Sequence, residues 1–171
     1  IEIDPDAHEQ AVENFENSPW GDRLFCYHAS FQEFFNEIEE SYDVIVSNPP
    51  FFENSSLASS NVNNRVKHNT GLTSYDLISS INKLLSNEGQ CWLILSIDFL
   101  KSYLTEIEKN NFQIRKEINV YGKPGILKRK VLMLSKQKGE CITSDFVIRN
   151  AKGKYTDQYI RITKDLHDRD L

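Results

Sequence analysis

The chain has 171 residues, of which 39% are hydrophobic and 26% charged, and its formal net charge is −5. These proportions suit one compact α/β domain over residues 1–171 with a hydrophobic core. No stretch approaches the ~20 apolar residues that a membrane-spanning helix needs. The negative charge excludes a general electrostatic affinity for nucleic acid, which would require local basic patches.

Apolar periodicity and turn residues predict alternating strands and helices. Strands are expected at residues 1–4, 23–29, 42–47, 90–97, 113–120 and 129–135, and helices at 5–16, 31–38, 74–85 and 99–109. This order predicts a parallel sheet with helices on both faces and an antiparallel pair at its end. Residues 53–70, rich in Asn and Ser, predict a mobile loop. For the polar tail, residues 151–171, a docked and a loose arrangement both stay open.

Two of these elements have informative sequences. Asp4 and Pro5 fit the N-cap and the first position of a helix. Residues 42–47 are almost continuously apolar and β-branched, which is typical of a parallel strand covered on both faces.

Three widely separated cysteines, Cys26, Cys91 and Cys141, form neither a CxxC pair nor a Cys/His metal pattern. Cys91 lies in an apolar, strand-like run. We therefore expect buried free thiols, a reducing cytoplasmic setting and no metal site.

The tetrapeptide Asn48-Pro49-Pro50-Phe51 directly follows the predicted strand at residues 42–47. It should occur by chance in roughly one chain in a thousand of this length. Ligands of such sheets bind beyond the carboxyl ends of the strands, where this tetrapeptide lies. An ordinary proline-rich loop is the simpler alternative.

The same four residues suit methylation of an amine conjugated to an aromatic ring or to an amide. Because the lone pair of that nitrogen is delocalised, its hydrogens need acceptors while the nitrogen pyramidalises. The Asn48 side-chain oxygen and a neighbouring backbone carbonyl can accept them, and the two prolines hold these acceptors in place beforehand. Phe51 offers a stacking face worth about 1–3 kcal/mol to a planar base. No general base is required, because the amine can lose its proton after attacking the methyl sulfonium.

The sequence resembles class I S-adenosylmethionine-dependent methyltransferases with an Asn-Pro-Pro-aromatic motif, and most closely the bacterial tRNA1(Val) adenine-N6 methyltransferases. The resemblance is carried by EIDPDAHEQAVENFENSPWGDRL, DVIVSNPPFFENS, the segment Arg65-Val66-Lys67-His68, GKPGILKRKVLMLSKQKGECITSDFVIRN and YTDQY. It implies a Rossmann-like, mostly parallel sheet with an antiparallel C-terminal strand pair. It also implies S-adenosylmethionine as cofactor and N6-methylation of the adenine beside the anticodon of a tRNA.

The resemblance assigns roles to individual positions. Asn48, Pro49, Pro50 and Phe51 match the catalytic loop, and Asn48 also lies beside the cofactor. Glu2 matches the acidic residue that holds the cofactor ribose, and Ile3 the apolar residue beside the cofactor adenine. Taken alone, the local sequence leaves the role of Glu2 open and favours Asp4 as a helix cap.

Two departures from the family pattern concern the cofactor. Ser30 stands where the family usually presents Asp to the cofactor adenine, so it would be a weaker, neutral partner. The first strand of the family, with its glycine-rich turn, does not occur in these 171 residues. We therefore expect sequence upstream of Ile1, and we expect the 171 residues alone to bind S-adenosylmethionine poorly.

Two basic clusters are candidates for contact with tRNA phosphates around a flipped base. One cluster contains Arg65, Lys67 and His68, and the other contains Lys123, Lys128, Arg129 and Lys130. An ordinary solvated surface explains each cluster equally well. His8 and His28 are better explained as structural than as catalytic residues.

Other functions stay open at this point. The same motif can methylate a guanine amino group in ribosomal RNA or a glutamine amide in a release factor, and Phe51 in place of Tyr is compatible with the guanine. A non-catalytic binding domain of this fold is a further alternative. Ser30 and the absent glycine-rich turn favour that alternative, and the intact motif argues against it.

Overall fold

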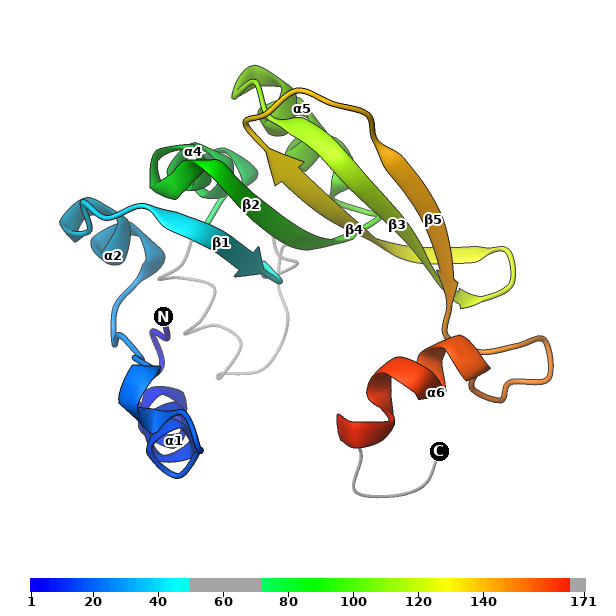
Figure 1. Ribbon diagram of the computed structural model, residues 1–171, viewed down its shortest axis with the longest axis horizontal. Helices are drawn as coiled ribbons and strands as arrows, with labels where there is room; N and C mark the ends of the chain where they lie inside the picture. The colour runs from blue at the N-terminus through cyan, green and yellow to red at the C-terminus, as the bar shows by residue number, and fades with distance from the viewer. Residues whose placement is uncertain (50–71, 167–171) are drawn as a thin grey trace, which may run out of the picture. The chain divides into compact units, whose positions relative to one another are not determined.

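The computed structural model describes residues 1–49 and 72–166 (Figure 1). These residues form two compact units, residues 1–40 with 72–73 and residues 41–49 with 74–166. The expectation of one domain over residues 1–171 stays a prediction. Outside the described residues lie the loop expected at 53–70, the motif residues Pro50 and Phe51, and the basic cluster Arg65, Lys67 and His68.

The first unit consists mainly of short helices. They are α1 (Pro5–Glu16), the 3-10 helix η1 (Gly21–Arg23) and α2 (Phe31–Glu37). At the start of α1, Asp4 Oδ1 accepts hydrogen bonds from the backbone N–H groups of Asp6 and Ala7, both at 3.0 Å. The predicted cap at Asp4 is therefore confirmed, as are the helices expected at residues 5–16 and 31–38.

The strand expected at residues 23–29 is wrong, because an isolated parallel bridge between Glu2 and His28 takes its place. The Glu2 N–H donates to the Tyr27 carbonyl at 3.0 Å, and the Ala29 N–H donates to the Glu2 carbonyl at 3.2 Å. The strand expected at residues 1–4 is likewise reduced to this bridge. Apolar alternation shows that a segment suits a strand, but a ladder also needs a partner of matching length.

The second unit contains a five-stranded mixed sheet (Figure 1). Its strands are β1 (Tyr42–Ser47), β2 (Leu85–Ser96), β3 (Gln113–Lys123), β4 (Ile126–Ser135) and β5 (Ile142–Val147). The spatial order is β1-β2-β4-β3-β5. The β1–β2 and β3–β5 pairs are parallel, whereas β4 is antiparallel to both of its neighbours.

The antiparallel pair expected near the C-terminus is the β3–β4 hairpin. Gly125 in its turn has φ 77°, a left-handed conformation that glycine adopts without steric cost. Strand β5 was not anticipated, because the polar residues within it interrupt its apolar pattern. Helix α6 (Asp157–Thr163) and the 3-10 helix η2 (Lys164–Leu166) follow, and α6 contacts β5. The described part of the tail is therefore docked.

Helices α4 (Ser74–Leu84) and α5 (Leu100–Lys109) contact each other and cover one face of the sheet (Figure 1). On β2, the alternate residues Cys91, Leu93 and Leu95 are buried on this face. Ile78 of α4 and Leu132 of β4 are also fully buried, so the core lies between these helices and the sheet. None of the helices that the structure describes is long and apolar enough to cross a membrane.

Strand β1 differs from its expected burial on both faces. Val44 is 60% exposed and Val46 is 71% exposed, although Ile45 between them is half-buried. The reason is that Val44 and Val46 pair with Gln90 and Trp92 of β2, on the face of the sheet that α4 and α5 do not cover. A continuous apolar run therefore coexists with one uncovered face.

The three cysteines are free thiols in different surroundings. Cys91 is buried, and the loss of solvation raises the pKa of its thiol to about 12, so the group is neutral at physiological pH. Cys26 is half-buried and Cys141 is exposed. The expectation of buried thiols is correct for Cys91 and wrong for Cys141, which lies in the connection before β5.

The position of the core leads to a prediction about the stability of the protein. Leu93→Ala should lower the free energy of unfolding by about 2–5 kcal/mol, because it leaves a cavity at a fully buried position. Leu104→Ala removes the same atoms from a side chain that is 37% exposed, and should cost less than about 1 kcal/mol. Urea denaturation measures both changes, and equal losses would contradict the proposed position of the core.

Candidate active site

Asn48 and Pro49 follow β1 directly, at its carboxyl end. Ser47, the last residue of β1, is in register with Leu93 of β2. Asn48 is exposed, and Pro49 behind it is buried. Because proline fixes its own backbone φ angle, a buried proline anchors the chain just after the amide side chain. The strand and Pro49 together hold Asn48 at the edge of the sheet.

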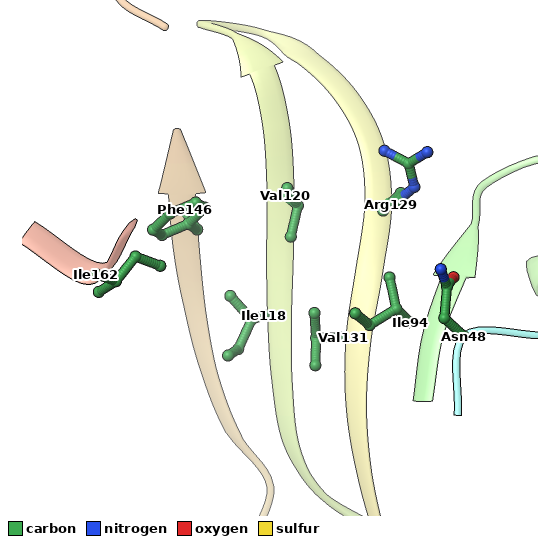
Figure 2. A pocket seen from close by; sticks show the side chains of 8 residues that line it. All are labelled: Asn48, Ile94, Ile118, Val120, Arg129, Val131, Phe146 and Ile162. Carbon is green, nitrogen blue, oxygen red and sulfur yellow. The ribbon is translucent and has the colours of Figure 1, made fainter. Parts of the chain in front are cut away.

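Asn48 borders a pocket of about 400 Å³ (Figure 2). Ile94, which also lines it, alternates along β2 with the buried Leu93 and Leu95, so the pocket lies on the face of the sheet opposite α4 and α5. The side chains that line it are Asn48, Ile94, Ile118, Val120, Arg129, Val131, Phe146 and Ile162. Figure 2 shows the Asn48 amide and the Arg129 guanidinium at one end of the pocket, with Phe146 and Ile162 at the other end. The pocket is thus an apolar trough with its polar groups at one end.

The register of the strands explains why these side chains share a face, since paired residues of neighbouring strands point to the same side. One row across the sheet consists of Ile94, Val131 and Ile118, and the next row consists of Arg129, Val120 and Phe146. Ile162 reaches the pocket from α6. Five apolar residues of the sheet therefore form one wall of the pocket, against which an apolar ring could pack.

The polar end of the pocket supplies complementary hydrogen-bonding groups. The Asn48 amide offers one oxygen acceptor and one NH₂ donor, whereas the Arg129 guanidinium offers only donors and a positive charge. Both side chains are exposed and therefore accessible to a ligand that enters the pocket. The arrangement can orient a flat heterocycle that carries an exocyclic amine.

The candidate cofactor residues Glu2, Ile3 and Ser30 belong to the first unit. Glu2 Oε1 accepts hydrogen bonds from the backbone N–H groups of Ile3 at 2.8 Å and Asp4 at 2.9 Å. These bonds hold the carboxylate at the point where the chain leaves the Glu2–His28 bridge. Because a carboxylate has two oxygens and further lone pairs, it retains acceptor capacity for a hydroxyl group. Glu2 therefore fits the binding of a ribose.

Ser30 has a structural role that the sequence analysis missed. Its Oγ accepts from the Glu33 N–H at 3.2 Å, and Glu33 Oε2 accepts from the Ser30 N–H at 2.8 Å, which is a capping box for α2. Hydrogen bonds from the side chain and then the backbone of Ser30 hold the pKa of Glu33 below its ordinary value. The spacing Ser30-x-x-Glu33 was the available signal. A cofactor contact of Ser30 stays a prediction.

The two histidines near these residues make backbone contacts. His8 Nε2 lies 3.2 Å from the Cys26 carbonyl oxygen, and His28 Nε2 lies 3.2 Å from the Ile3 carbonyl oxygen. Their rings are 5.0 Å apart and tilted by 31°. Both therefore connect α1 to the bridge between Glu2 and His28, in agreement with the structural role expected for them.

The basic cluster of the β3–β4 hairpin is divided between different surroundings. Lys130 forms an ion pair with Glu117 on β3. Arg129 lines the pocket, whereas Lys123 and Lys128 are exposed near the tip of the hairpin. The cluster thus supplies one pocket residue and two surface charges. The sequence did not predict the apolar residues that line the pocket, because apolar alternation does not show which face of a sheet the helices leave uncovered.

Comparison with known proteins identifies the family. The model of the Eco57I restriction-modification methylase family matches residues 2–124. A tRNA1(Val) (adenine(37)-N6)-methyltransferase of Flavobacterium psychrophilum is 37% identical over 165 residues, which are 96% of this chain and 70% of the relative. The chain therefore belongs to the same methyltransferase family as this relative. Another relative of that name, from Christiangramia forsetii, is 34% identical over 170 residues, which are 98% of this chain and 71% of the relative.

Solved structures agree with the fold of this methyltransferase family. A predicted O-methyltransferase of Agrobacterium tumefaciens superimposes with a TM-score of 0.60 at 12% identity, covering 96% of this chain and 74% of that one. At such low identity the likeness concerns the fold alone, and it confirms the expected α/β methyltransferase architecture.

Among the residues that the structure describes, no group of three or more His, Cys, Asp or Glu could hold a metal ion.

The capping box predicts the behaviour of two Ser30 variants. Ser30→Ala should destabilise α2 by about 1 kcal/mol and return the pKa of Glu33 toward its ordinary value, because the hydroxyl is lost. Ser30→Asp should retain the cap, since Asp is an equally good N-cap residue. Urea denaturation and an NMR titration of Glu33 measure these effects. An unchanged Glu33 pKa in Ser30→Ala would contradict the assignment of the cap.

Proposed function

We propose that the protein methylates N6 of an adenine next to the anticodon of a tRNA, using S-adenosylmethionine. The observation that carries this proposal is membership of a family whose relatives are named tRNA1(Val) (adenine(37)-N6)-methyltransferases. It is supported by Asn48 and Pro49 at the carboxyl end of β1, beside a pocket with an apolar wall. An enzyme that acts on a base in folded RNA must take it out of the stack, which requires such a pocket.

Asn48 is the residue that acts on the reacting nitrogen. Its side-chain oxygen accepts one N6–H of the adenine, and the backbone carbonyl of a neighbouring motif residue accepts the other. These two bonds draw the lone pair away from the ring, so that N6 can attack. S-adenosylmethionine supplies an electrophilic methyl group on a sulfonium. The proton that N6 then loses requires no dedicated base.

The prolines and the aromatic residue prepare this geometry. Buried Pro49 restricts the backbone on the carboxyl side of Asn48, so the acceptor oxygens need little reorganisation during the reaction. Pro50 extends this restriction, and Phe51 stacks on the adenine ring. An adenine ring bound against the apolar wall displaces water from beside Asn48, which would otherwise compete for the N6–H groups.

The cofactor contacts fall to residues of the first unit. The Glu2 carboxylate, held by two backbone N–H groups, accepts hydrogen bonds from the cofactor ribose. Ile3 lies beside the cofactor adenine, and Ser30 offers that adenine a neutral partner. Because the Ser30 hydroxyl is neutral, it contributes less binding free energy than the charged Asp usual in the family would contribute.

The RNA contacts expected from the sequence fit this assignment to different degrees. Arg129 is placed to meet a phosphate or the base at the pocket, and Lys123 and Lys128 are free to meet phosphates at the surface. Lys130 is a weaker candidate because Glu117 already neutralises it. Arg65, Lys67 and His68 remain candidates from the sequence.

The substrate is tested by incubating the full-length protein with labelled S-adenosylmethionine and total RNA. We expect label in the tRNA fraction, and nuclease digestion should recover it as N6-methyladenosine. Methyl transfer to ribosomal RNA alone or to protein alone would overturn the assignment and favour the guanine or glutamine alternatives. No transfer to any fraction would favour a non-catalytic binding domain.

The role of Asn48 makes a separate prediction. Asn48→Ala should lower kcat by at least about 10²–10³-fold, because it removes a hydrogen bond that strengthens in the transition state. Its affinity for S-adenosylmethionine should fall only a few-fold by calorimetry. Asn87→Ala is a matched control at an exposed position near the opposite end of β2, and should retain full turnover. Turnover that survives in Asn48→Ala would show that the mechanism is wrong.

A further inference from the structure

We infer that a second surface of the protein, separate from the pocket, binds phosphates of the tRNA substrate. This hairpin-end surface is made by Lys123, Lys128, Arg149, Lys152 and Lys154. It joins the tip of the β3–β4 hairpin to the connection between β5 and α6. The inference rests on the proposed function, and it adds Arg149, Lys152 and Lys154 to the residues that meet RNA.

Backbone hydrogen bonds place the two segments side by side. The Ile148 N–H donates to the Tyr121 carbonyl at 2.9 Å, and the Arg149 N–H donates to the Gly122 carbonyl at 3.2 Å. These bonds continue the parallel β3–β5 pairing to the end of the hairpin. Basic residues that are more than twenty positions apart in the sequence therefore share one end of the sheet.

The hairpin-end surface is strongly positive although the chain as a whole is acidic. Residues 121–130 contain four basic side chains, of which Lys130 is paired with Glu117, and no acidic one. Residues 148–156 contain three basic side chains and no acidic one, and Asp157 follows them. Lys123, Lys128, Lys152 and Lys154 are exposed, and within the described part of the chain none of them forms an ion pair. The net charge of the chain is −5, so the chain as a whole repels a polyanion. Positive charges that are concentrated at one place and not neutralised can still attract one there.

The turn that carries the two new lysines is held rigidly. Asn150 Oδ1 accepts from the backbone N–H groups of Lys152 at 3.0 Å and Lys154 at 3.1 Å, and the Asn150 N–H donates to the Lys154 carbonyl at 2.8 Å. Gly153 has φ 81°, which permits this tight turn. A backbone that is already ordered loses little entropy when a ligand binds.

Arg149 is fixed beside the same turn. Its guanidinium lies 3.9 Å from the centre of the Tyr155 ring, and its Nη1 donates to the Gly153 carbonyl at 2.8 Å. Tyr155 in turn stacks on Tyr159 of α6 at 4.6 Å with an angle of 10°. A guanidinium held this way keeps its other N–H groups for a phosphate, with less rotamer entropy to lose than a free side chain.

The position of the surface relative to the pocket favours RNA over other polyanions. Arg129 and Val120, which line the pocket, are paired with each other, and Lys123 lies three residues further along β3. At about 3.3 Å per residue, the surface begins about 10 Å from the pocket row. If a base of an RNA chain enters the pocket, the phosphates next to that base lie about this far away. An acidic protein or a membrane would not account for a positive surface at this distance from a pocket for a base.

The test compares two double variants of the full-length protein with equal loss of charge. Lys152→Ala with Lys154→Ala removes two charges from the hairpin-end surface. Lys101→Ala with Lys138→Ala removes two exposed charges elsewhere, on α5 and in the connection between β4 and β5. Melting curves establish that both variants fold. The measurements are tRNA affinity by filter binding at several salt concentrations, and KM and kcat for methylation of the same tRNA.

The Lys152→Ala, Lys154→Ala variant should bind tRNA about tenfold more weakly at 0.15 M salt. The slope of its log affinity against log salt concentration should be smaller in magnitude by about one to two. KM for tRNA should rise equally, with kcat and S-adenosylmethionine affinity unchanged. The control should match the wild type. If the two double variants bind tRNA equally well, the inference is wrong. It is also wrong if the Lys152→Ala, Lys154→Ala variant loses binding to anionic vesicles but binds tRNA as the wild type does. Both outcomes leave the proposed function standing, because wild-type methylation of tRNA tests that function separately.

Discussion

The parallel pairing of β1 with β2 is the constraint on which the described site depends. The register that sets Ser47 beside Leu93 brings Asn48 to the edge of the sheet, next to the wall that begins at Ile94. The buried side of β2 holds this register in place, because a slip of one residue would move Leu93 out of the core. Hydrophobic burial on one face of the sheet therefore positions the Asn48 amide, which borders the pocket on the other face.

The chemistry proposed for this site needs rigidity more than reactivity. An adenine amine is a poor nucleophile because its lone pair belongs partly to the ring, and oriented acceptors correct this without any group of unusual pKa. In the described part of the chain, the pKa of Glu33 is lowered by a helix cap and that of Cys91 is raised by burial in the core, so both shifts have structural causes. Preorganised hydrogen-bond acceptors of this kind are a large term in catalysis because they need no rearrangement as the reaction proceeds.

Recognition of a large RNA by an acidic chain requires that positive charge be concentrated. The β3–β5 pairing does this by placing the β3–β4 hairpin beside the turn around Asn150. Together with Arg129 at the pocket, the two segments supply the positive charge that we propose for binding the tRNA phosphates.

The sequence by itself determined most of the alternation of helices and strands, the cap at Asp4 and the motif that begins at Asn48. These are local features, set by hydrophobic period, side-chain hydrogen bonding and backbone restriction within a few residues. Only the tertiary structure decided which segments pair: residues 23–29 form one bridge instead of a strand, and β5 joins β3. Pairing and the uncovered face that forms the pocket depend on contacts between distant residues, which no local pattern contains.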